Sequence, residues 1–421
     1  METRVFVELN RGNNLIALSE ADQIIGPAMM RDSLGGGVGA SPVGGSPNNT
    51  TLFSNKVFRE ARQILSTQVQ SEDIGSLIED SNIAAIWEDP PLQPAHLEIA
   101  STSSFDPTVA IGTSADVISL LKCHEFWDDG IKGDNVAIAI CDSGVDKDQF
   151  PVIDGWAPDG TTPWGEQADS PGGWHGSMVA NAALLAAPNA KILDVGVLKY
   201  SNLDRGAWLS DALKGMNWIS NWMEANPGYR VIVNNSWSTY RRLPSDLDAN
   251  VRTYADSRLH PFNERLEVIV GDGTPILFAA GNCGSPDPDL RCGSGDTGPD
   301  VSVWGAASLD SVLSVAAIDV NGNRLPYSSQ GRGSIDPEKP DFSCYSQFKG
   351  YMPSVDPGTS TASPVLAGCV ALLLSAFPDL KPDVIFNILK ASCGAAPNWS
   401  SDFGYGTPGS ISLRTVLNSV N

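Results

Sequence analysis

Positive charge is scarce in this chain of 421 residues. It has 27 lysines and arginines against 49 aspartates and glutamates, which gives a formal net charge of −22 at pH 7. A protein that binds nucleic acid needs lysine and arginine to neutralise the backbone phosphates. We therefore expect no nucleic-acid partner. The acidity favours solubility and carries little information about the fold.

Uninterrupted apolar runs are short, and none approaches the length of about 18 residues that a membrane-spanning helix needs. The first residues, from Met1 to Leu9, are typical of a short alternating strand. They lack the basic and apolar regions of a signal peptide. The sequence therefore predicts no membrane partner. It favours a cytoplasmic location by default and does not exclude secretion.

Cysteine and histidine are also few, with seven and four residues. No Cys/His spacing matches a zinc site. Because seven is odd, at least one cysteine is unpaired within the chain. Cys141 and Cys369 lie in apolar runs and are interpreted as buried small hydrophobes. Cys283 and Cys292 flank a loop rich in proline and aspartate, where the sequence allows either a disulfide or two free thiols.

The rest of the composition is that of a folded protein, with 42% hydrophobic and 18% charged residues, and the length allows one large domain and a smaller one. Residues 1–95 resemble a small α+β unit, with strands at Val5–Leu9 and Ile83–Asp89, helical spacing at Phe58–Leu65 and a helix start near Ser71. Residues 96–114 are interpreted as a linker, and residues 115–421 as the larger domain.

In the larger domain, short apolar strands alternate with longer amphipathic segments, which is the pattern of a mostly parallel α/β sheet flanked by helices. The run Val136–Cys141 is apolar at every position. Such a run is expected of a strand that is buried on both faces.

One stretch near the C-terminal end carries a candidate nucleophile. The sequence Gly358-Thr359-Ser360 precedes an apolar run long enough for a buried helix, and Pro364 is expected in the first turn of that helix. Ser360 would then lie at a helix N-terminus, where unpaired N–H groups favour negative charge. Such a serine can act as a nucleophile if a base is near. Taken alone, such a serine is more typical of an N-cap before a core helix.

Three further segments contain residues suited to the same chemistry. Asp142 follows the strand Val136–Cys141, at the strand end where parallel sheets place their sites. His175 opens a segment of small residues, and Asn282 lies between glycines after another strand. Each has a structural alternative: a turn-forming aspartate, a packed histidine and an asparagine chosen for its backbone tolerance.

Together and in this order, Asp142, His175, Asn282 and Ser360 resemble the catalytic set of the subtilisin-like serine peptidases, or subtilases, over roughly residues 115–415. Other segments that fit the family are Gly130-Ile131-Lys132-Gly133, Ala187-Pro188-Asn189-Ala190, Ser314–Asp319 and Lys339-Pro340-Asp341. The resemblance implies a three-layer subtilisin-like fold.

The resemblance also implies a serine endopeptidase mechanism. Ser360 would attack the scissile carbonyl, His175 would transfer the proton, and Asp142 would orient the imidazole. The Asn282 amide would stabilise the oxyanion. A peptide or protein substrate would bind as an extended strand along Ser236, Trp237 and Ser238, and Ala279, Ala280 and Gly281 would wall the primary specificity pocket. The family usually has glycine where this chain has Ser238, which would narrow that pocket.

Residues 1–95 resemble, more weakly, the ferredoxin-like inhibitory propeptide of the same family. This implies a zymogen in which the N-terminal domain acts as an intramolecular inhibitor and self-cleavage falls within 90–111. An ordinary N-terminal domain that stays attached is the alternative. The chemistry requires no cofactor. The family often binds structural calcium, but no metal ligands can be assigned from this sequence.

Three other functions remain open. A sedolisin-like acid peptidase shares the fold but uses glutamate in place of His175 and aspartate in place of Asn282; activity that is high at neutral or alkaline pH would exclude it. In a peptide macrocyclase or ligase, an amine would intercept the acyl-enzyme, and residues 239–272 are the candidate insertion for shielding it. A catalytically silent binding module would not react with a fluorophosphonate at Ser360.

Overall fold

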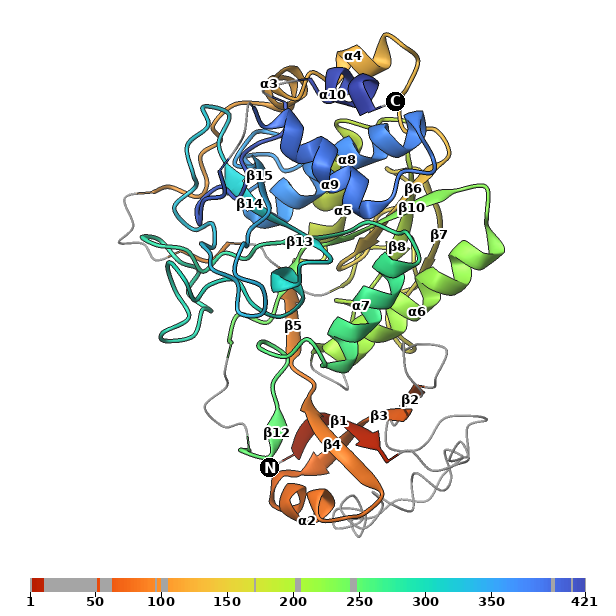
Figure 1. Cartoon of the computed structure of the whole chain (residues 1–421), viewed down its shortest axis with the longest axis vertical. Helices are drawn as coiled ribbons and strands as arrows, with labels where there is room; N and C mark the ends of the chain where they lie inside the picture. The colour runs from red at the N-terminus through yellow and green to blue at the C-terminus, as the bar shows by residue number, and fades with distance from the viewer. Residues whose placement is uncertain are drawn as a thin grey trace.

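A seven-stranded sheet forms the centre of the molecule (Figure 1). The computed structural model describes residues 2–10, 51–53, 63–94, 97–99, 105–169, 172–200, 206–242, 248–394, 398–409 and 412–420. The strand order is β15-β14-β13-β10-β6-β8-β7, and all neighbouring strands are parallel. The bounds are β6 Val136–Cys141, β7 Val152–Trp156, β8 Lys191–Val195, β10 Arg230–Asn235, β13 Ile276–Ala279, β14 Leu313–Ile318 and β15 Phe342–Tyr345. The predicted parallel sheet is therefore confirmed.

Helices cover both faces of this sheet and complete the predicted three layers (Figure 1). Along β6, Ile138 and Ile140 belong to the core formed with α5 and α8. The alternate residues Ala137 and Ala139 belong to the core formed with α6 and α7. Both faces of β6 are thus buried, which explains its unbroken apolar run. The helices are α3 Ser114–Leu120, α4 His124–Trp127, α5 His175–Leu184, α6 Leu209–Ala225, α7 Pro261–Gly271, α8 Thr359–Ala376, α9 Pro382–Ser392 and α10 Leu413–Val420.

Helix α8 runs through the core, and every residue from Thr359 to Leu374 is buried. Among the described helices it alone has the length and apolar character to cross a membrane, but 89% of it is buried inside the protein, which fits a core helix. Pro364 lies in its second turn, one turn later than the sequence predicts. Proline cannot donate to the carbonyl of Ser360 four residues earlier. The Ser236 hydroxyl donates to that carbonyl instead, at 3.0 Å.

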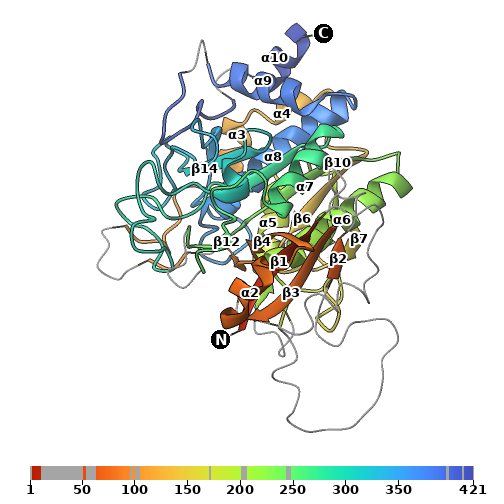
Figure 2. The ribbon, with the colours of Figure 1, turned by 60° about the horizontal axis from the view of Figure 1, so that its bottom comes forward.

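Four strands of the N-terminal region and β12, from much later in the chain, form a separate five-stranded sheet with the order β12-β4-β1-β3-β2, seen in Figure 2. β1 pairs antiparallel with β3 and β4. The strand predicted at Ile83–Asp89 is present as β4, whereas Gln63–Leu65, predicted as helical, begin β3; residues 58–62 of that prediction lie outside the described residues. The elements are β1 Glu2–Leu9, β2 Thr51–Phe53, β3 Gln63–Gln70, α2 Ile74–Ile78, β4 Ile83–Glu88 and β12 Val251–Arg252.

A third, three-stranded sheet joins the two parts. Strand β5 (Pro91–Pro94) lies between β9 (Ala207–Trp208) and β11 (Trp237–Ser238), antiparallel to both. Just before it, the Asp89 carboxylate accepts hydrogen bonds from the backbone N–H and the hydroxyl of Ser210, both at 2.8 Å. The Ser210 N–H belongs to the first turn of α6, so Asp89 caps that helix from outside it.

Candidate active site

Asp142 and His175 come together at the carboxyl end of the central sheet. Asp142 directly follows β6, and His175 is the first residue of α5. His175 Nδ1 lies 2.8 Å from Asp142 Oδ1, and both residues are fully buried. Asp142 Oδ1 also accepts the Ser143 N–H at 2.7 Å, which fixes the carboxylate. The carboxylate thereby holds the imidazole by one nitrogen. The other, Nε2, is buried and has no hydrogen-bond partner among the described residues.

Ser360 is brought to the same edge of the sheet by the packing of α8 on α5 (Figure 1). The helices approach closely because Gly368 has no side chain: a Cβ there would lie 2.3 Å from the Ala183 carbonyl oxygen. At their N-terminal ends, the Thr361 hydroxyl lies 3.9 Å from Met178 Sδ. Thr361 follows Ser360, and Met178 lies one helical turn after His175. The two candidate catalytic residues therefore begin neighbouring helices.

Asn282 is held by the residue that precedes Ser360. Its carboxamide oxygen accepts the Thr359 N–H at 3.0 Å and the Thr359 hydroxyl at 2.9 Å. With the oxygen fixed in this way, the amide nitrogen faces away from Thr359. The Asn282 side chain also hydrogen-bonds the Tyr240 hydroxyl, and burial raises the Tyr240 pKa. The sequence did not single out Thr359 as a partner of Asn282, because the two are 77 positions apart.

The predicted substrate-binding residues fall into two groups. Trp237 and Ser238 form β11 and pair with β5, whereas Ser236 is fully buried and supports the α8 backbone. Ala279 and Ala280 line a cavity of only about 20 Å³. Gly281 follows them in the sequence and precedes Asn282. Its N–H donates to the Thr359 hydroxyl at 3.3 Å.

The small cavity is lined in part by an indole that the sequence did not single out. Trp304 lines it together with Ser238, Thr239 and Ala280. Its Nε1 donates to the Thr239 hydroxyl at 2.9 Å, and only 7% of the residue is exposed. A volume of about 20 Å³ admits little more than one water molecule.

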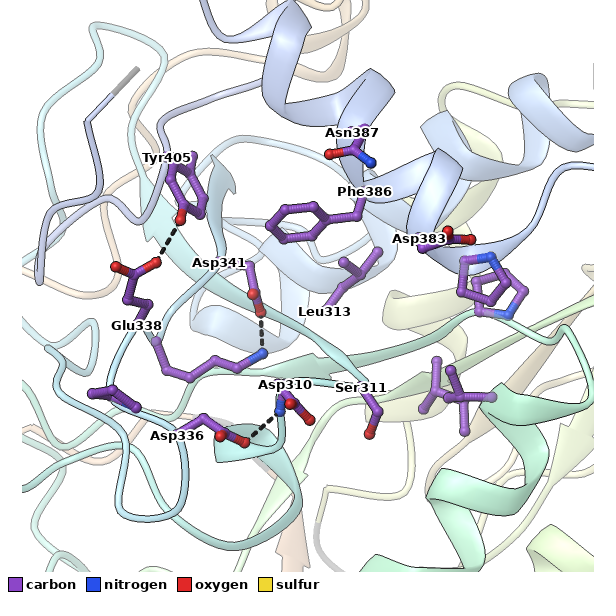
Figure 3. Close-up of a pocket in the computed structure, with 16 residues that line it drawn as sticks. Asp310, Ser311, Leu313, Asp336, Glu338, Asp341, Asp383, Phe386, Asn387 and Tyr405 are labelled. Atoms are coloured by element: carbon purple, nitrogen blue, oxygen red, sulfur yellow. Dashed lines mark hydrogen bonds and ion pairs between the residues drawn. The ribbon is translucent and has the colours of Figure 1, made fainter. Parts of the chain in front are cut away.

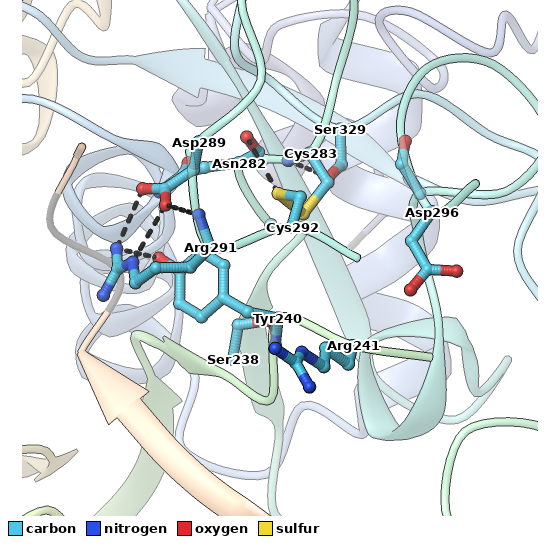
Figure 4. The surroundings of a disulfide bond; sticks show 12 residues. Ser238, Tyr240, Arg241, Asn282, Cys283, Asp289, Arg291, Cys292, Asp296 and Ser329 are labelled. Atoms are coloured by element: carbon cyan, nitrogen blue, oxygen red, sulfur yellow. Dashed lines mark hydrogen bonds and ion pairs between the residues drawn. A yellow bond between two sulfur atoms is a disulfide. The ribbon is translucent and has the colours of Figure 1, made fainter. Parts of the chain in front are cut away.

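Cys283, which follows Asn282, forms a disulfide with Cys292, with Cα atoms 5.8 Å apart. This resolves the choice that the sequence left open. The loop closed by the bond carries Asp289 and Arg291, whose side chains meet over the Tyr240 ring (Figure 4).

Metal ligands are not gathered at this site. Within the part of the chain that the structure describes, no group of three or more His, Cys, Asp or Glu side chains could hold a metal ion. A larger pocket of about 460 Å³, lined by Asp310, Asp336, Glu338 and Asp341, lies at the amino ends of β13 and β14 (Figure 3). That is the edge of the sheet opposite the candidate active site, so the pocket plays no part in its chemistry.

The chain is similar in sequence to a known protein family and to several of its members. Residues 133–406 match the model of the subtilase family. The chain is 27% identical to subtilisin DY of Bacillus licheniformis over 300 residues, covering 69% of this chain and 93% of that protein. It is 28% identical to subtilisin E of Bacillus subtilis (strain 168) over 276 residues, covering 62% of this chain and 61% of that protein.

Two solved structures share the fold. Fervidolysin from Fervidobacterium pennivorans, a keratinolytic enzyme related to subtilisin, matches 99% of this chain and 61% of its own with a TM-score of 0.62 and 17% identity. A lanthipeptide protease matches 72% of this chain and 93% of its own with a TM-score of 0.51 and 18% identity. The chain thus spans about three fifths of the fervidolysin chain.

Proposed function

Because the chain belongs to the subtilase family of serine-type endopeptidases, we propose that it hydrolyses peptide bonds through Asp142, His175 and Ser360. The observation that carries the proposal is the buried hydrogen bond of 2.8 Å between Asp142 Oδ1 and His175 Nδ1. It leaves Nε2 as the only ring nitrogen for proton transfer, on a helix whose first turn packs beside that of Ser360.

In the proposed reaction, His175 Nε2 removes the proton of the Ser360 hydroxyl as its oxygen attacks the scissile carbonyl. The resulting imidazolium faces the Asp142 carboxylate, which stabilises its charge. The proton then passes to the leaving amine, the C–N bond breaks and an acyl-enzyme remains. Water activated by His175 hydrolyses this ester and releases Ser360.

The oxyanion would be bound by the Asn282 amide and the Ser360 N–H. Thr359 supports this role, because its N–H and hydroxyl hold the Asn282 oxygen and so direct the amide nitrogen away from Thr359. One such donor contributes roughly 3 to 4 kcal/mol to transition-state stabilisation. The Ser360 N–H lies in the first turn of α8, at the positive end of the helix dipole, which favours a developing negative charge.

Strand β5 supports the proposed mode of substrate binding. It lies antiparallel between β9 and β11, as a peptide would when it binds by main-chain hydrogen bonds. Leu92 of β5 is 4% exposed and packs in the core beside α6. We propose that β5 occupies the substrate groove, so that residues 1–95 inhibit the enzyme of the same chain. Cleavage would then fall within 90–111.

The contacts of the candidate insertion for ligation bear on the choice between hydrolysis and ligation. Within residues 239–272, β12 pairs with β4 of the N-terminal sheet, and the His260 ring nitrogen Nε2 lies 2.8 Å from the Glu88 carbonyl oxygen. Through these contacts, the insertion binds the N-terminal sheet. We therefore favour hydrolysis over ligation.

Two measurements on purified wild type and Ser360→Ala test the proposal. A fluorophosphonate probe should label the wild type and leave the variant unlabelled; equal labelling of both, or of neither, would reject Ser360 as the nucleophile. Intact mass should show the wild type split within 90–111 and the variant as one chain. A wild type that is labelled but stays whole would remove only the self-processing proposal.

A further inference from the structure

Arg291 is held rigidly beside the groove. Its Nε and Nη2 donate to the two Asp289 carboxylate oxygens, each at 2.8 Å. Nη2 also donates to the Tyr240 hydroxyl at 2.7 Å, and the guanidinium lies 3.8 Å from the Tyr240 ring centroid (Figure 4). Asp289 is 2% exposed, and the Cys283–Cys292 disulfide closes the loop that carries both residues. A planar guanidinium fixed at three of its donors has little freedom to turn.

The remaining nitrogen of Arg291 contacts the strand in the groove. Nη1 donates to the Pro94 carbonyl oxygen at 3.1 Å and to Gln93 Oε1 at 3.4 Å. Both acceptors belong to β5, in the register where Gln93 pairs with Ser238. Arg291 therefore contacts β5 through a main-chain oxygen that every peptide has and through a side-chain oxygen that few residues can supply.

We propose that Arg291 is a specificity-determining residue, which selects substrates with glutamine or glutamate at the position that Gln93 occupies in the groove. The inference rests on the proposed function and names the substrate class of that site. Glutamine and glutamate both carry an oxygen at the distance of Gln93 Oε1, and glutamate adds the attraction between opposite charges. A lysine or arginine there would meet a guanidinium that cannot be deprotonated. An apolar side chain would leave the Nη1 donor without a side-chain acceptor.

Quenched fluorogenic peptides that span residues 88–99 test this, with Gln, Glu, Met or Lys at the position of Gln93. We expect kcat/KM for Gln and Glu to exceed that for Met by about ten- to a hundredfold, as for hydrogen bonds to charged groups, with Lys lowest. Replacing Arg291 alone would leave the buried Asp289 charge uncompensated. The paired variant Asp289→Asn with Arg291→Gln avoids this and should bring Glu and Met within about twofold.

Arg230→Gln, which removes an exposed arginine bonded to the Pro378 carbonyl, is the matched control and should leave the profile unchanged. Rates for Met that equal those for Glu in the wild type would overturn the inference while the peptidase function stands. The inference would also be overturned if the paired variant, shown to be folded by its thermal unfolding, still preferred Glu over Met.

A second readout does not depend on catalysis. In full-length Ser360→Ala, hydrogen exchange of the amides of Leu92 and Gln93 reports how firmly β5 is held. Gln93→Met should speed this exchange about tenfold and Gln93→Glu should slow it, and both effects should vanish in the paired variant. Unchanged exchange in Gln93→Met would refute the subsite even if the chain proves to have no peptidase activity.

Discussion

Replacing Trp304 by alanine should change the substrate preference of the enzyme from small to large residues at the cleaved position. In the proposed site, Ala279 and Ala280 wall the pocket for the residue whose carbonyl is attacked. That pocket has a free volume of about 20 Å³, and the Trp304 indole is one of its walls. The wild type should therefore prefer glycine or alanine at that position.

The size of the effect follows from the apolar surface that the pocket would bury. A phenylalanine side chain that becomes fully buried gains about 1.5 to 3 kcal/mol. At 1.4 kcal/mol per factor of ten, Trp304→Ala should raise kcat/KM for a phenylalanine substrate about 10- to 150-fold. The change also removes a side chain that is 7% exposed and should cost about 3 to 5 kcal/mol of stability. Trp304→Val, which leaves a smaller void, is the fallback if the alanine variant unfolds.

The assay compares peptides that differ only in glycine, alanine, leucine or phenylalanine at the cleaved position. Trp127→Ala is the matched control: Trp127 lies in α4 and its Nε1 donates to the Ala186 carbonyl at 2.8 Å, away from the groove. It should lower stability and leave the preference unchanged. A folded Trp304→Ala enzyme that still rejects phenylalanine would show that this cavity is not the primary specificity pocket.

Three further outcomes are expected. Asn282→Ala should lower kcat by about a hundred- to a thousandfold with little change in KM; a loss below threefold would exclude it from the oxyanion site. Asp142→Asn should lower kcat by about 10⁴ at neutral pH, whereas a variant with full activity would remove Asp142 from the triad. Burial raises the pKa of Asp89 from 3.8 to about 6, so its ionisation destabilises the docked N-terminal part by about 3 kcal/mol, and stability should fall as pH rises from 4 to 6. In the Ser360→Ala background, Asp89→Asn should flatten that dependence in denaturant unfolding; an unchanged slope would contradict it.

The central sheet and its helices could be predicted because their signals are local. Val136–Cys141 is apolar at every position, and Ser360 precedes a long buried helix. The identity and order of the four candidate residues along the chain indicated the subtilase family. Strand β3 was missed because Phe58–Leu65 has helical spacing, while its pairing with β1 joins residues more than 50 positions apart. Tertiary pairing of this kind overrides local propensity.

The parts of the site that the sequence did not indicate are those built from distant residues. Thr359 is recognisable only once its distance to Asn282 is known, and Arg291 only once β5 lies in the groove. In the sequence, Trp304 looks like an ordinary core residue. Its proposed role becomes visible only when the structure shows that it lines the small cavity. Single residues in loops or at a helix start carry no hydrophobic periodicity, so a periodic pattern does not indicate their roles.

The contacts of Glu88 link the shape of the pocket to the presence of the N-terminal part of the chain. Its carboxylate accepts the Tyr254 N–H at 3.0 Å, and Tyr254 lines the same cavity as Trp304. If the proposed cleavage beyond β5 occurs and the N-terminal fragment diffuses away, Tyr254 would lose this anchor. Release of the fragment would then empty the groove and change the position of Tyr254 beside it. The cleaved enzyme with the fragment still bound and the enzyme without it should therefore differ in substrate selectivity as well as in rate.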